Sequence, residues 1–187
     1  RNKAIAKASG DYIILIDGDM ILQTRFIQDH SRNAMPGFFI QGSRVLLSEI
    51  QTKIILRKRK IFISMFSLGL KNRKNSIHSN SLSRLFSNES SHLRGIKTCN
   101  FAFYREDCIS VNGFNNDFNG WGREDSDFAS RLINIGIKRR TLKFNAIQYH
   151  LWHKENNRNS LASNDEILQK TIDKKLTWCD NGIDRFL

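Results

Sequence analysis

The chain has 187 residues, of which 40% are hydrophobic, and this suits one globular domain, or a large part of one, with a real core. Its formal net charge is +12, and the stretch from Lys53 to Lys97 holds eleven Lys or Arg and one acid, Glu89. Such an excess of positive charge indicates a polyanionic partner: nucleic acid, a membrane surface or a phosphorylated substrate.

The cysteine and hydropathy patterns argue against a disulfide-stabilised or zinc-binding protein and against a membrane-spanning protein. Cys99, Cys108 and Cys179 are an odd number without C-x-x-C spacing, which favours neither a disulfide framework nor a zinc site and fits a reducing cytoplasm. No signal peptide is visible, and the longest mostly apolar run, Ile61 to Leu70, has about half of the ~20 residues that a transmembrane helix needs. We therefore expect that the chain does not span a membrane by itself.

The first elements follow from the apolar pattern. "RNKAIAKASG" predicts a helix already in progress at Arg1 that stops at Gly10, so we expect the chain to be the later part of a longer protein. Tyr12 to Ile16 is a continuous apolar run, typical of a strand covered on both faces in a parallel sheet. A helix over 23–34 and a strand over 38–47 are expected next.

The middle of the chain is basic and polar. Residues 53–70 predict a basic amphipathic helix, and residues 71–91, rich in Ser, Asn and Lys, predict a mobile loop. Later elements are a strand over 98–104, a helix over 124–136, a strand over 141–149 and a helix over 160–176. This alternation of strands and helices predicts an α/β fold.

"ILIDGDM" places Asp17 and Asp19 directly after the first strand. In open α/β sheets ligands bind beyond the carboxyl ends of the strands. Two adjacent carboxylates repel each other unless a cation holds both ionised, and hard carboxylate oxygens suit Mg²⁺ or Mn²⁺. The alternative is a simple strand-ending turn, for which Asp and Gly are also favoured.

"GWGREDSDF" places two glycines and Trp121 before Glu124 and Asp125, which open a helix. A helix N-terminus favours the ionised carboxylate, which can accept a proton. The flat apolar face of Trp121 is of the kind that sugar rings stack on. Ordinary helix capping and an ordinary core Trp are the structural alternatives.

"YHLWHKENN" places His150 and His153 three residues apart, close enough to meet one ion if the backbone turns between them. A histidine near a strand end is also common as a purely structural residue. The sequence leaves both interpretations open.

Together these segments resemble a known family. D-G-D after a buried strand, then G-W-G-x-E-D, then a strand ending near H-x-x-H, resembles the inverting glycosyltransferases of the GT-A fold, family two, and the related galactosyltransferase C-terminal region. The resemblance covers nearly the whole chain except residues 48–95. It implies a GT-A-like mixed sheet flanked by helices, in one partial domain over 1–187 with a basic insertion at about 48–95.

The resemblance also implies roles for matching residues. Asp19 would coordinate Mn²⁺ or Mg²⁺ bound to the donor diphosphate, and Asp17 would lie near the donor's ribose or sugar. Asp125 would be the general base for the acceptor hydroxyl, and Glu124 would hold the acceptor sugar. Further matching positions are Trp121 and Gly122, which would shape the acceptor pocket, and His153, which would ligate the metal. His150 stands where galactosyltransferases often have Met, so a second histidine ligand stays open.

The implied chemistry is consistent with these roles. A metal acts as a Lewis acid on the leaving phosphates, and one displacement assisted by a base on the opposite face inverts the anomeric centre. Two carboxylates also serve glycoside hydrolysis, but that reaction requires neither D-x-D nor a histidine ligand. Because the family's base-binding strands precede the point where this chain starts, we expect the chain alone to bind donor poorly.

The basic segment 53–74 interleaves cations with Ile, Phe and Met. This pattern is typical of a helix on an anionic membrane surface, and equally of a solvated insertion with one packed face. Nucleic-acid binding is disfavoured because no recognised motif accompanies the charge.

The sequence therefore predicts a metal-dependent inverting hexosyl- or hexosaminyltransferase. It would use a nucleotide-sugar donor, with a UDP-sugar preferred, and a glycan or lipid-linked glycan acceptor in cell-surface polysaccharide or lipopolysaccharide synthesis. The expected location is cytoplasmic, and the membrane-surface interpretation of residues 53–74 would place the protein peripherally at the inner face of the membrane. The alternative is a non-catalytic basic module that binds an anionic membrane surface or nucleic acid.

Overall fold

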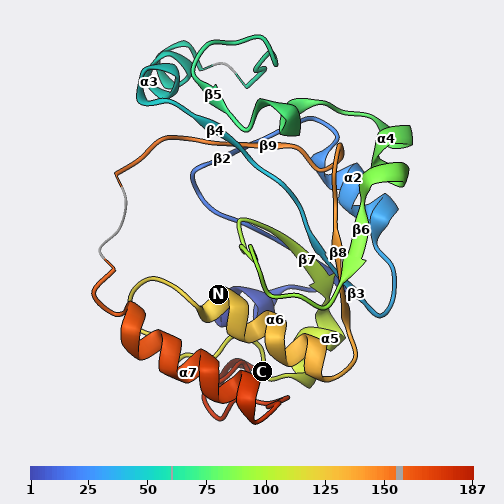
Figure 1. Cartoon of the computed structure of the whole chain (residues 1–187), viewed down its shortest axis with the longest axis vertical. Coiled ribbons are helices and arrows are strands. Elements are labelled where there is room, and N and C mark those ends of the chain that lie inside the picture. The colour runs from blue at the N-terminus through green and yellow to red at the C-terminus, as the bar shows by residue number, and fades with distance from the viewer. Residues whose placement is uncertain (60, 155–157) are drawn as a thin grey trace.

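A computed structural model describes residues 1–59, 61–154 and 158–187, and it has the expected mixed α/β architecture with two sheets (Figure 1). Sheet A contains, in spatial order, β1 (Tyr12–Ile16), β7 (Asn100–Tyr104), β3 (Phe38–Gln41), β8 (Lys138–Thr141) and β6 (Asn88–Ser90). Sheet B contains β2 (Met20–Leu22), β9 (Gln148–His150), β4 (Val45–Leu47) and β5 (Leu70–Lys71).

Helices flank both sheets (Figure 1). They are α1 (Asn2–Lys7), α2 (Phe26–Asn33), α3 (Glu49–Lys58), α4 (Asn80–Phe86), α5 (Arg105–Ser110), α6 (Glu124–Asn134) and α7 (Leu161–Asp173), with 3-10 turns at Arg73–Ser76 and Asp184–Phe186. Within the described residues, no helix combines the length and the apolar character needed to cross a membrane.

Sheet A is packed on both faces, and successive side chains of its inner strand β7 point to opposite faces. Phe101 and Phe103 of β7 face α6, where their rings lie 6.0 and 5.1 Å from that of Phe128. Ala102 faces the other way and packs with Phe26 of α2. A fully buried Phe contributes about 1.5–3 kcal/mol, so the aromatic layer between β7 and α6 is a main source of stability.

The first strand has the expected bounds but not the expected environment. β1 pairs antiparallel with β7 and stands at the end of the order of sheet A, and Ile16 is exposed. The prediction that this strand lies in a parallel sheet was therefore wrong, whereas packing on both of its faces is found. Its apolar run reflects packing into both cores, with Ile13 in the α6-side cluster and Ile14 in the α2-side cluster.

Two single strands expected from the sequence are each divided between the sheets. Residues 38–47 form β3 of sheet A and β4 of sheet B. Of the strand expected over 141–149, Thr141 ends β8, residues 142–147 lie outside the strands, and β9 begins at Gln148. At the first division a Cβ on Gly42 would lie 2.3 Å from the side chain of Asn100. A larger residue would displace Asn100, so glycine suits the point at which the chain leaves sheet A.

The basic helix predicted over 53–70 was wrong in its bounds. α3 begins earlier, at Glu49, where the Ser48 hydroxyl accepts a hydrogen bond from the amide of Gln51 at 3.2 Å. It ends at Lys58 because Arg59 adopts a left-handed conformation and its amide bonds to carbonyls of the last turn. Residues 61–69 have no regular structure before β5, and Lys60 lies outside the described residues.

The mobile loop predicted over 71–91 was also wrong. This stretch holds a 3-10 turn, helix α4 and strand β6. The Ser79 hydroxyl caps α4 by accepting from the amide of Leu82 at 3.3 Å, and β6 pairs antiparallel with β8. The serines read as loop signals therefore act as caps and strand residues. The helices expected over 23–34, 124–136 and 160–176 are confirmed to within three residues at each end.

Candidate functional site

The predicted site residues gather at one edge of sheet A. β1 and β3 both run antiparallel to β7, so their carboxyl ends and the start of β7 lie at the same edge. Asp17 follows β1, Arg44 lies just beyond β3, and Thr98 and Cys99 precede β7. Ligands of open α/β sheets bind at this kind of edge.

Asp19 and the two histidines meet through sheet B. Met20 of β2 pairs with His150 of β9, and the amide of Leu151 donates to the carbonyl of Asp19 at 2.9 Å. The Oδ2 atom of Asp19 lies 3.2 Å from Nε2 of His150 and 3.1 Å from Nε2 of His153. These three side chains offer ligand atoms within 4.8 Å of one another, as needed to hold one ion.

The hydrogen bonds of this cluster fit a bound cation. Nδ1 of His153 must donate to the carbonyl of Lys154 at 2.8 Å, because a carbonyl can only accept. In the neutral ring this leaves the lone pair of Nε2 facing the carboxylate of Asp19, and two acceptors do not attract without a proton or metal between them. Oδ1 of Asp19 is buried without a hydrogen-bond partner among the described residues. One carboxylate and two imidazoles are suitable ligands for Mn²⁺.

The electrostatics of His150 favour the neutral ring that binds metal. Burial is the main cause that lowers the pKa of His150, with Arg44 and His153 adding to the shift, while Asp19 and Asp17 oppose it. A neutral imidazole keeps a lone pair for a metal. Mg²⁺ prefers oxygen ligands, so the two imidazoles favour Mn²⁺ of the two expected ions.

Asp125 lies in the first turn of α6 and accepts hydrogen bonds from residue 98. The Thr98 amide donates to its Oδ2 at 2.9 Å and the Thr98 hydroxyl to its Oδ1 at 3.2 Å. Arg1 donates to Oδ1 of Asp125 at 3.1 Å and to Oε1 of Glu124 at 3.0 Å.

Burial is the largest cause of a raised pKa at Asp125. Burial and the neighbouring Glu124 raise this pKa to about 6, against the opposing effects of Arg1 and the Thr98 hydrogen bond. A carboxylate with a pKa near 6 is mostly ionised at neutral pH and is a stronger base than an ordinary Asp.

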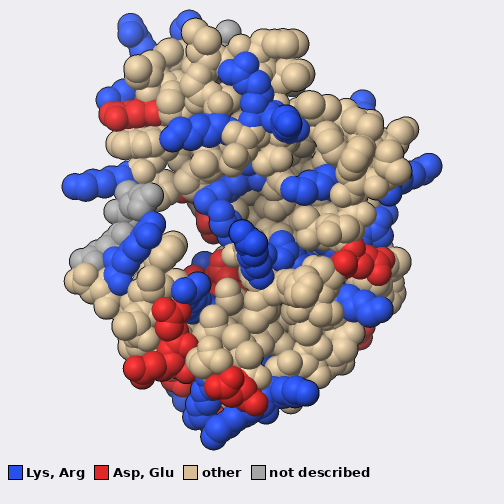
Figure 2. All heavy atoms as spheres, viewed as in Figure 1, with Lys and Arg blue, Asp and Glu red and all other residues tan. Residues whose placement is uncertain are grey.

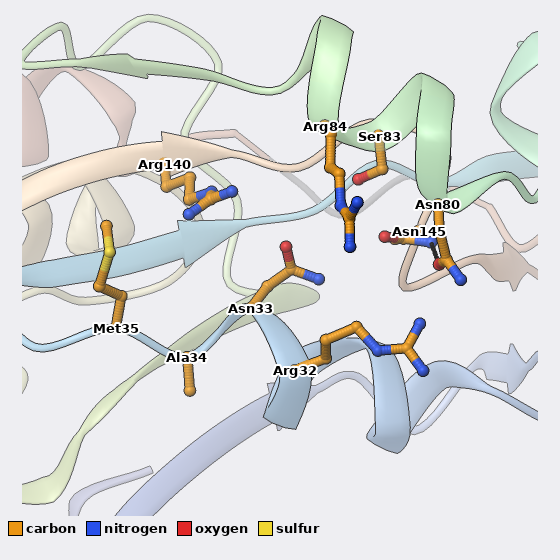
Figure 3. Close-up of a pocket in the computed structure, with 9 residues that line it drawn as sticks. All are labelled: Arg32, Asn33, Ala34, Met35, Asn80, Ser83, Arg84, Arg140 and Asn145. Carbon is orange, nitrogen blue, oxygen red and sulfur yellow. Dashed lines mark hydrogen bonds between the residues drawn. The ribbon is translucent and has the colours of Figure 1, made fainter.

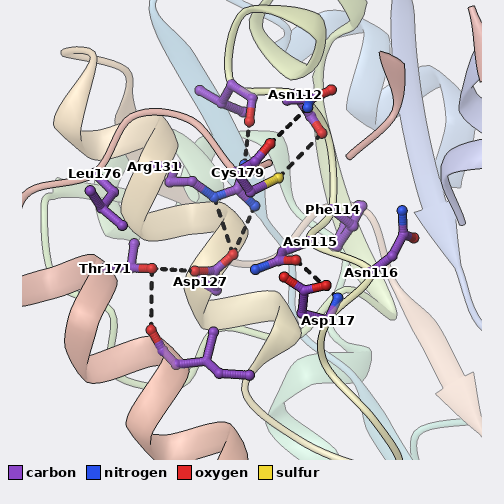
Figure 4. Close-up of polar contacts among 12 residues, drawn as sticks. Asn112, Phe114, Asn115, Asn116, Asp117, Asp127, Arg131, Thr171, Leu176 and Cys179 are labelled. Atoms are coloured by element: carbon purple, nitrogen blue, oxygen red, sulfur yellow. Dashed lines mark hydrogen bonds and ion pairs between the residues drawn. The ribbon is translucent and has the colours of Figure 1, made fainter. Parts of the chain in front are cut away.

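Buried polar contacts hold α6 from behind (Figure 4). Oδ2 of Asp127 accepts from Arg131 at 2.8 and 3.1 Å, and its Oδ1 accepts from the hydroxyl of Thr171 on α7 at 2.6 Å. Arg131 also donates to the carbonyl of Val111. These contacts fix α6 between α7 and the segment after α5, and so fix the direction in which Asp125 points.

The loop before α6 is fixed by α7. The side chain of Asn164 donates to the carbonyls of Asn119 and Gly122 at 3.0 and 2.9 Å. Gly122 has φ +107°, a conformation that L side chains rarely adopt. Trp121 is 45% exposed, and the guanidinium of Arg158 lies 5.0 Å from its ring centre. The indole therefore has an exposed part that a sugar ring could contact.

Thr98, Cys99 and Arg44 connect the two parts of the site. Thr98 contacts Asp125, and the next residue, Cys99, accepts from Arg44 at 3.7 Å. Arg44 and Asp17 act electrostatically on both Cys99 and His150. Figure 2 shows a hollow between the sheet B part of the molecule and the α6–α7 part, with acidic side chains inside it and Lys and Arg along its rim.

Sequence reasoning missed three contributors to this site: Arg1, Thr98 and Arg44. None belongs to a recognisable motif, and each reaches the site from a different segment of the chain. Their only sequence signal is their position next to predicted strands or helices.

A cavity of about 410 Å³ lies elsewhere, between α2, α4 and β8 (Figure 3). Arg32, Arg84 and Arg140 are among its lining residues, and none of the predicted site residues is. Because the carboxylates and histidines capable of metal and proton chemistry gather at the edge of sheet A, we assign the candidate site to that edge.

One of the comparisons with known proteins matches a family of glycosyltransferases. Residues 81–154 match a family model described as the N-terminal domain of galactosyltransferase. This span includes Trp121, Glu124, Asp125 and both histidines, and it ends before α7. No curated protein matches the chain. The family match supports a glycosyltransferase-like domain, and with it a glycosyltransferase function in general, which implies a nucleotide-sugar donor and an acceptor.

Proposed function

We propose that the chain carries the catalytic centre of a metal-dependent inverting glycosyltransferase of the GT-A type. It would transfer a hexosyl or hexosaminyl group from a nucleotide sugar, with UDP-sugars as the preferred donors, to a glycan acceptor in cell-surface polysaccharide or lipopolysaccharide synthesis. The observation that carries the proposal is the approach of both histidine Nε2 atoms to one oxygen of Asp19, at the sheet edge where Thr98 also binds Asp125.

Each residue has a defined part in this mechanism. Asp19, His150 and His153 would hold Mn²⁺ or Mg²⁺, which when bound stabilises negative charge on the leaving diphosphate. Asp17, on the same edge, would contact the donor's ribose or sugar. The Asp125 carboxylate would accept the proton of the acceptor hydroxyl while that oxygen bonds to the anomeric carbon. Attack from the face opposite the diphosphate inverts the centre.

The acceptor would lie against the loop before α6. Glu124 would accept hydrogen bonds from the acceptor sugar, and the exposed part of Trp121 would stack on its ring. Gly122 would leave room for the sugar beside the backbone. Arg1 holds Glu124 and Asp125 with one guanidinium nitrogen, so it acts as a positioning residue for both carboxylates.

Nucleoside diphosphate release tests the catalytic proposal. The protein is incubated with a panel of nucleotide sugars and simple glycan acceptors, with Mn²⁺ or with EDTA. We expect release from one donor that EDTA abolishes and that Asp125→Asn lowers by about 10²- to 10⁴-fold. Asp173→Asn, at the exposed end of α7, is the matched control and should leave the rate unchanged. Equal rates in Asp125→Asn and wild type would refute the proposal that Asp125 is the base.

Metal binding tests the ion site without catalysis. Titration of Mn²⁺ followed by electron paramagnetic resonance should show one tight site. Asp19→Asn and His153→Ala should each weaken binding at least about tenfold. His92→Ala, which alters an exposed histidine outside the cluster, is the matched control. Binding that is equal in all variants would show that the cluster is not a metal site.

A non-catalytic basic module is the second candidate function. The observation that favours it is the exposure of Arg57, Lys58 and Arg59 beside exposed apolar side chains. Asp19→Ala would then leave binding to anionic vesicles or RNA intact, and neutralising Arg57 to Arg59 would abolish it. Absence of diphosphate release from every donor, together with such binding, would favour this candidate.

A further inference from the structure

The segment between α3 and β5 lies at one end of the molecule (Figure 1), and it exposes large apolar side chains. Phe62, Phe66 and Leu68 are 75%, 77% and 84% exposed. Soluble proteins expose single apolar residues freely, but a run of them indicates an interaction surface. We call the surface formed by these side chains and by exposed Leu56 in the last turns of α3 the docking rim: Leu56, Ile61, Phe62, Phe66 and Leu68.

Cations accompany the docking rim without compensating acids. Residues 50–76 contain no Asp or Glu, and the exposed basic side chains among the described residues of this range are Lys53, Arg57, Lys58, Arg59, Lys71, Arg73 and Lys74. Only Lys53 forms an ion pair with an acid there, with Glu49 at 2.6 Å. The surface thus combines positive charge with exposed apolar side chains.

We propose that the docking rim inserts into the headgroup region of an anionic lipid bilayer. Anionic headgroups attract clustered Lys and Arg, and apolar side chains gain by entering the boundary with the acyl chains. Leu56, Ile61 and Leu68 are aliphatic and cannot stack on nucleobases, which single-stranded nucleic acid requires of its aromatic platforms. Charge complementarity and aliphatic exposure together favour lipid.

The docking rim is anchored to β9 and the residues that follow it, which carry His150 and His153 of the candidate metal site. The hydroxyl of Tyr149 on β9 donates to the carbonyl of Ile63 at 3.1 Å, and the amide of Trp152 donates to the hydroxyl of Thr52 on α3 at 2.8 Å. Ile55 and Ile63 pack in the same apolar cluster as Tyr149. These contacts tie both α3 and the segment after it to residues 149–152, which precede His153.

This anchoring indicates which acceptor the site would use. A protein docked through the rim holds residues 149–153 close to the membrane, so an acceptor glycan attached to a membrane lipid would reach the site directly. This step rests on the proposed function, because it assumes that the cluster serves sugar transfer. Lipid binding itself does not depend on that assumption.

Vesicle sedimentation tests the docking rim. The probes are vesicles of phosphatidylcholine alone and vesicles with about one third phosphatidylglycerol. We expect binding to the anionic vesicles that is at least tenfold weaker in the double variant Phe62→Ser/Leu68→Ser. Arg57→Gln/Lys58→Gln/Arg59→Gln should weaken binding about fivefold per charge. The aliphatic control is Ile27→Ser on α2, and the charge control is Lys170→Gln/Lys174→Gln/Lys175→Gln around the end of α7.

The outcomes distinguish insertion into a bilayer from adsorption by net charge and from contact with a second copy of the chain. If both charge triplets weaken binding equally, or the apolar variants bind normally, the protein adsorbs by net charge alone and the proposal fails. If the wild type forms dimers in sedimentation velocity runs and Phe62→Ser/Leu68→Ser does not, the rim is an interface between copies and the proposal also fails.

Two further readouts separate docking from catalysis. Asp125→Asn should bind anionic vesicles as the wild type does, since Asp125 lies on α6 and bonds to Arg1 and Thr98, neither of which belongs to the docking rim. Transfer to a vesicle-embedded acceptor should fall in Phe62→Ser/Leu68→Ser, while transfer to a soluble acceptor stays unchanged. Vesicle binding without any diphosphate release would refute the proposed function and leave the docking proposal intact.

Discussion

The α6 side of sheet A and the segment 49–76 on sheet B use charge in opposite ways. On the α6 side, Asp127 and Arg131 are each 1% exposed and fully engaged in hydrogen bonds behind the helix. In segment 49–76, the Glu49–Lys53 pair is exposed, and among the described residues no other cation of this segment forms an ion pair with an acid. The charged side chains behind α6 therefore position the candidate site, whereas the cations of segment 49–76 remain available to bind a partner.

The comparison is tested first by breaking one ion pair in each region. Asp127→Asn should destabilise the protein by about 3–5 kcal/mol, because it leaves Arg131 buried without its counter-charge. Lys53→Ala should cost about 0.3–0.5 kcal/mol, as for other exposed pairs on one helix face. Urea denaturation measures both. Similar losses would mean that the α6 network is not the rigid support inferred here.

Glycine substitutions test how tightly the site edge is packed. Gly42→Ala should cost roughly 1–3 kcal/mol, because the new Cβ would lie 2.3 Å from Asn100 and displace it. Asn100 donates to the carbonyls of Ser43 and Ala146, so its displacement loosens two segments at the site. Gly18→Ala has no atom within 4 Å of the new Cβ and should change stability by less than about 0.5 kcal/mol. Thermal unfolding of both variants makes the comparison.

The pH dependence of stability tests the environment of Asp125. Its folded-state pKa is about 6 against an ordinary 3.8, so the folded protein binds this proton more strongly than the unfolded chain does. The contribution of Asp125 to stability should therefore fall as pH rises from about 4 to about 6, by on the order of 3 kcal/mol, and stay constant above. Asp125→Asn should lack this fall when free energies of unfolding are compared across pH.

The pH dependence of the transfer rate also tests the pKa of Asp125. The rate should rise with pH as Asp125 ionises near pH 6 and then level off. Arg1→Gln removes a positive charge that lowers this pKa, so it should move the rise to higher pH. Glu124→Gln removes a negative charge that raises the pKa, so it should move the rise to lower pH. Initial rates under saturating donor measure the shift, and no movement in either variant would contradict the pKa argument.

The smallest effect is expected in the docking rim. Phe62→Ser should change the free energy of unfolding by less than about 0.5 kcal/mol, because the ring is already 75% exposed. Phe128→Ala, which empties the aromatic layer under α6, should cost about 3–5 kcal/mol in the same denaturation experiment. A large loss in Phe62→Ser would show that the rim is part of the core.

Local sequence signals were sufficient where one segment determines its own structure. The apolar run of Tyr12 to Ile16 gave the bounds of β1, and the acids and glycine around residues 124–136 gave the bounds of α6 nearly to the residue. The same signals failed over 53–70 and 71–91. There the left-handed Arg59 ended the helix early, and pairing with β8 turned a polar stretch into β6.

The residues of the candidate site likewise fall into those that the sequence predicted and those that it did not. D-G-D, W-G-R-E-D and H-x-x-H could be found in the sequence because each joins its acids or histidines within a few residues. Arg1, Thr98 and Arg44 could not, because they come from separate segments and have no spacing in common. Their position depends on strands that meet only after the chain folds.

The sequence by itself determined the α/β class, the three motifs and the uneven distribution of charge, because these depend on residue types and short spacings. Only the tertiary structure decided that β1 is an edge strand, that two expected strands divide between sheets, and that Asp19 meets both histidines. The reason is physical: contacts between residues 19 and 150, or between 98 and 125, form through pairing and packing across the whole chain, and no local pattern records them.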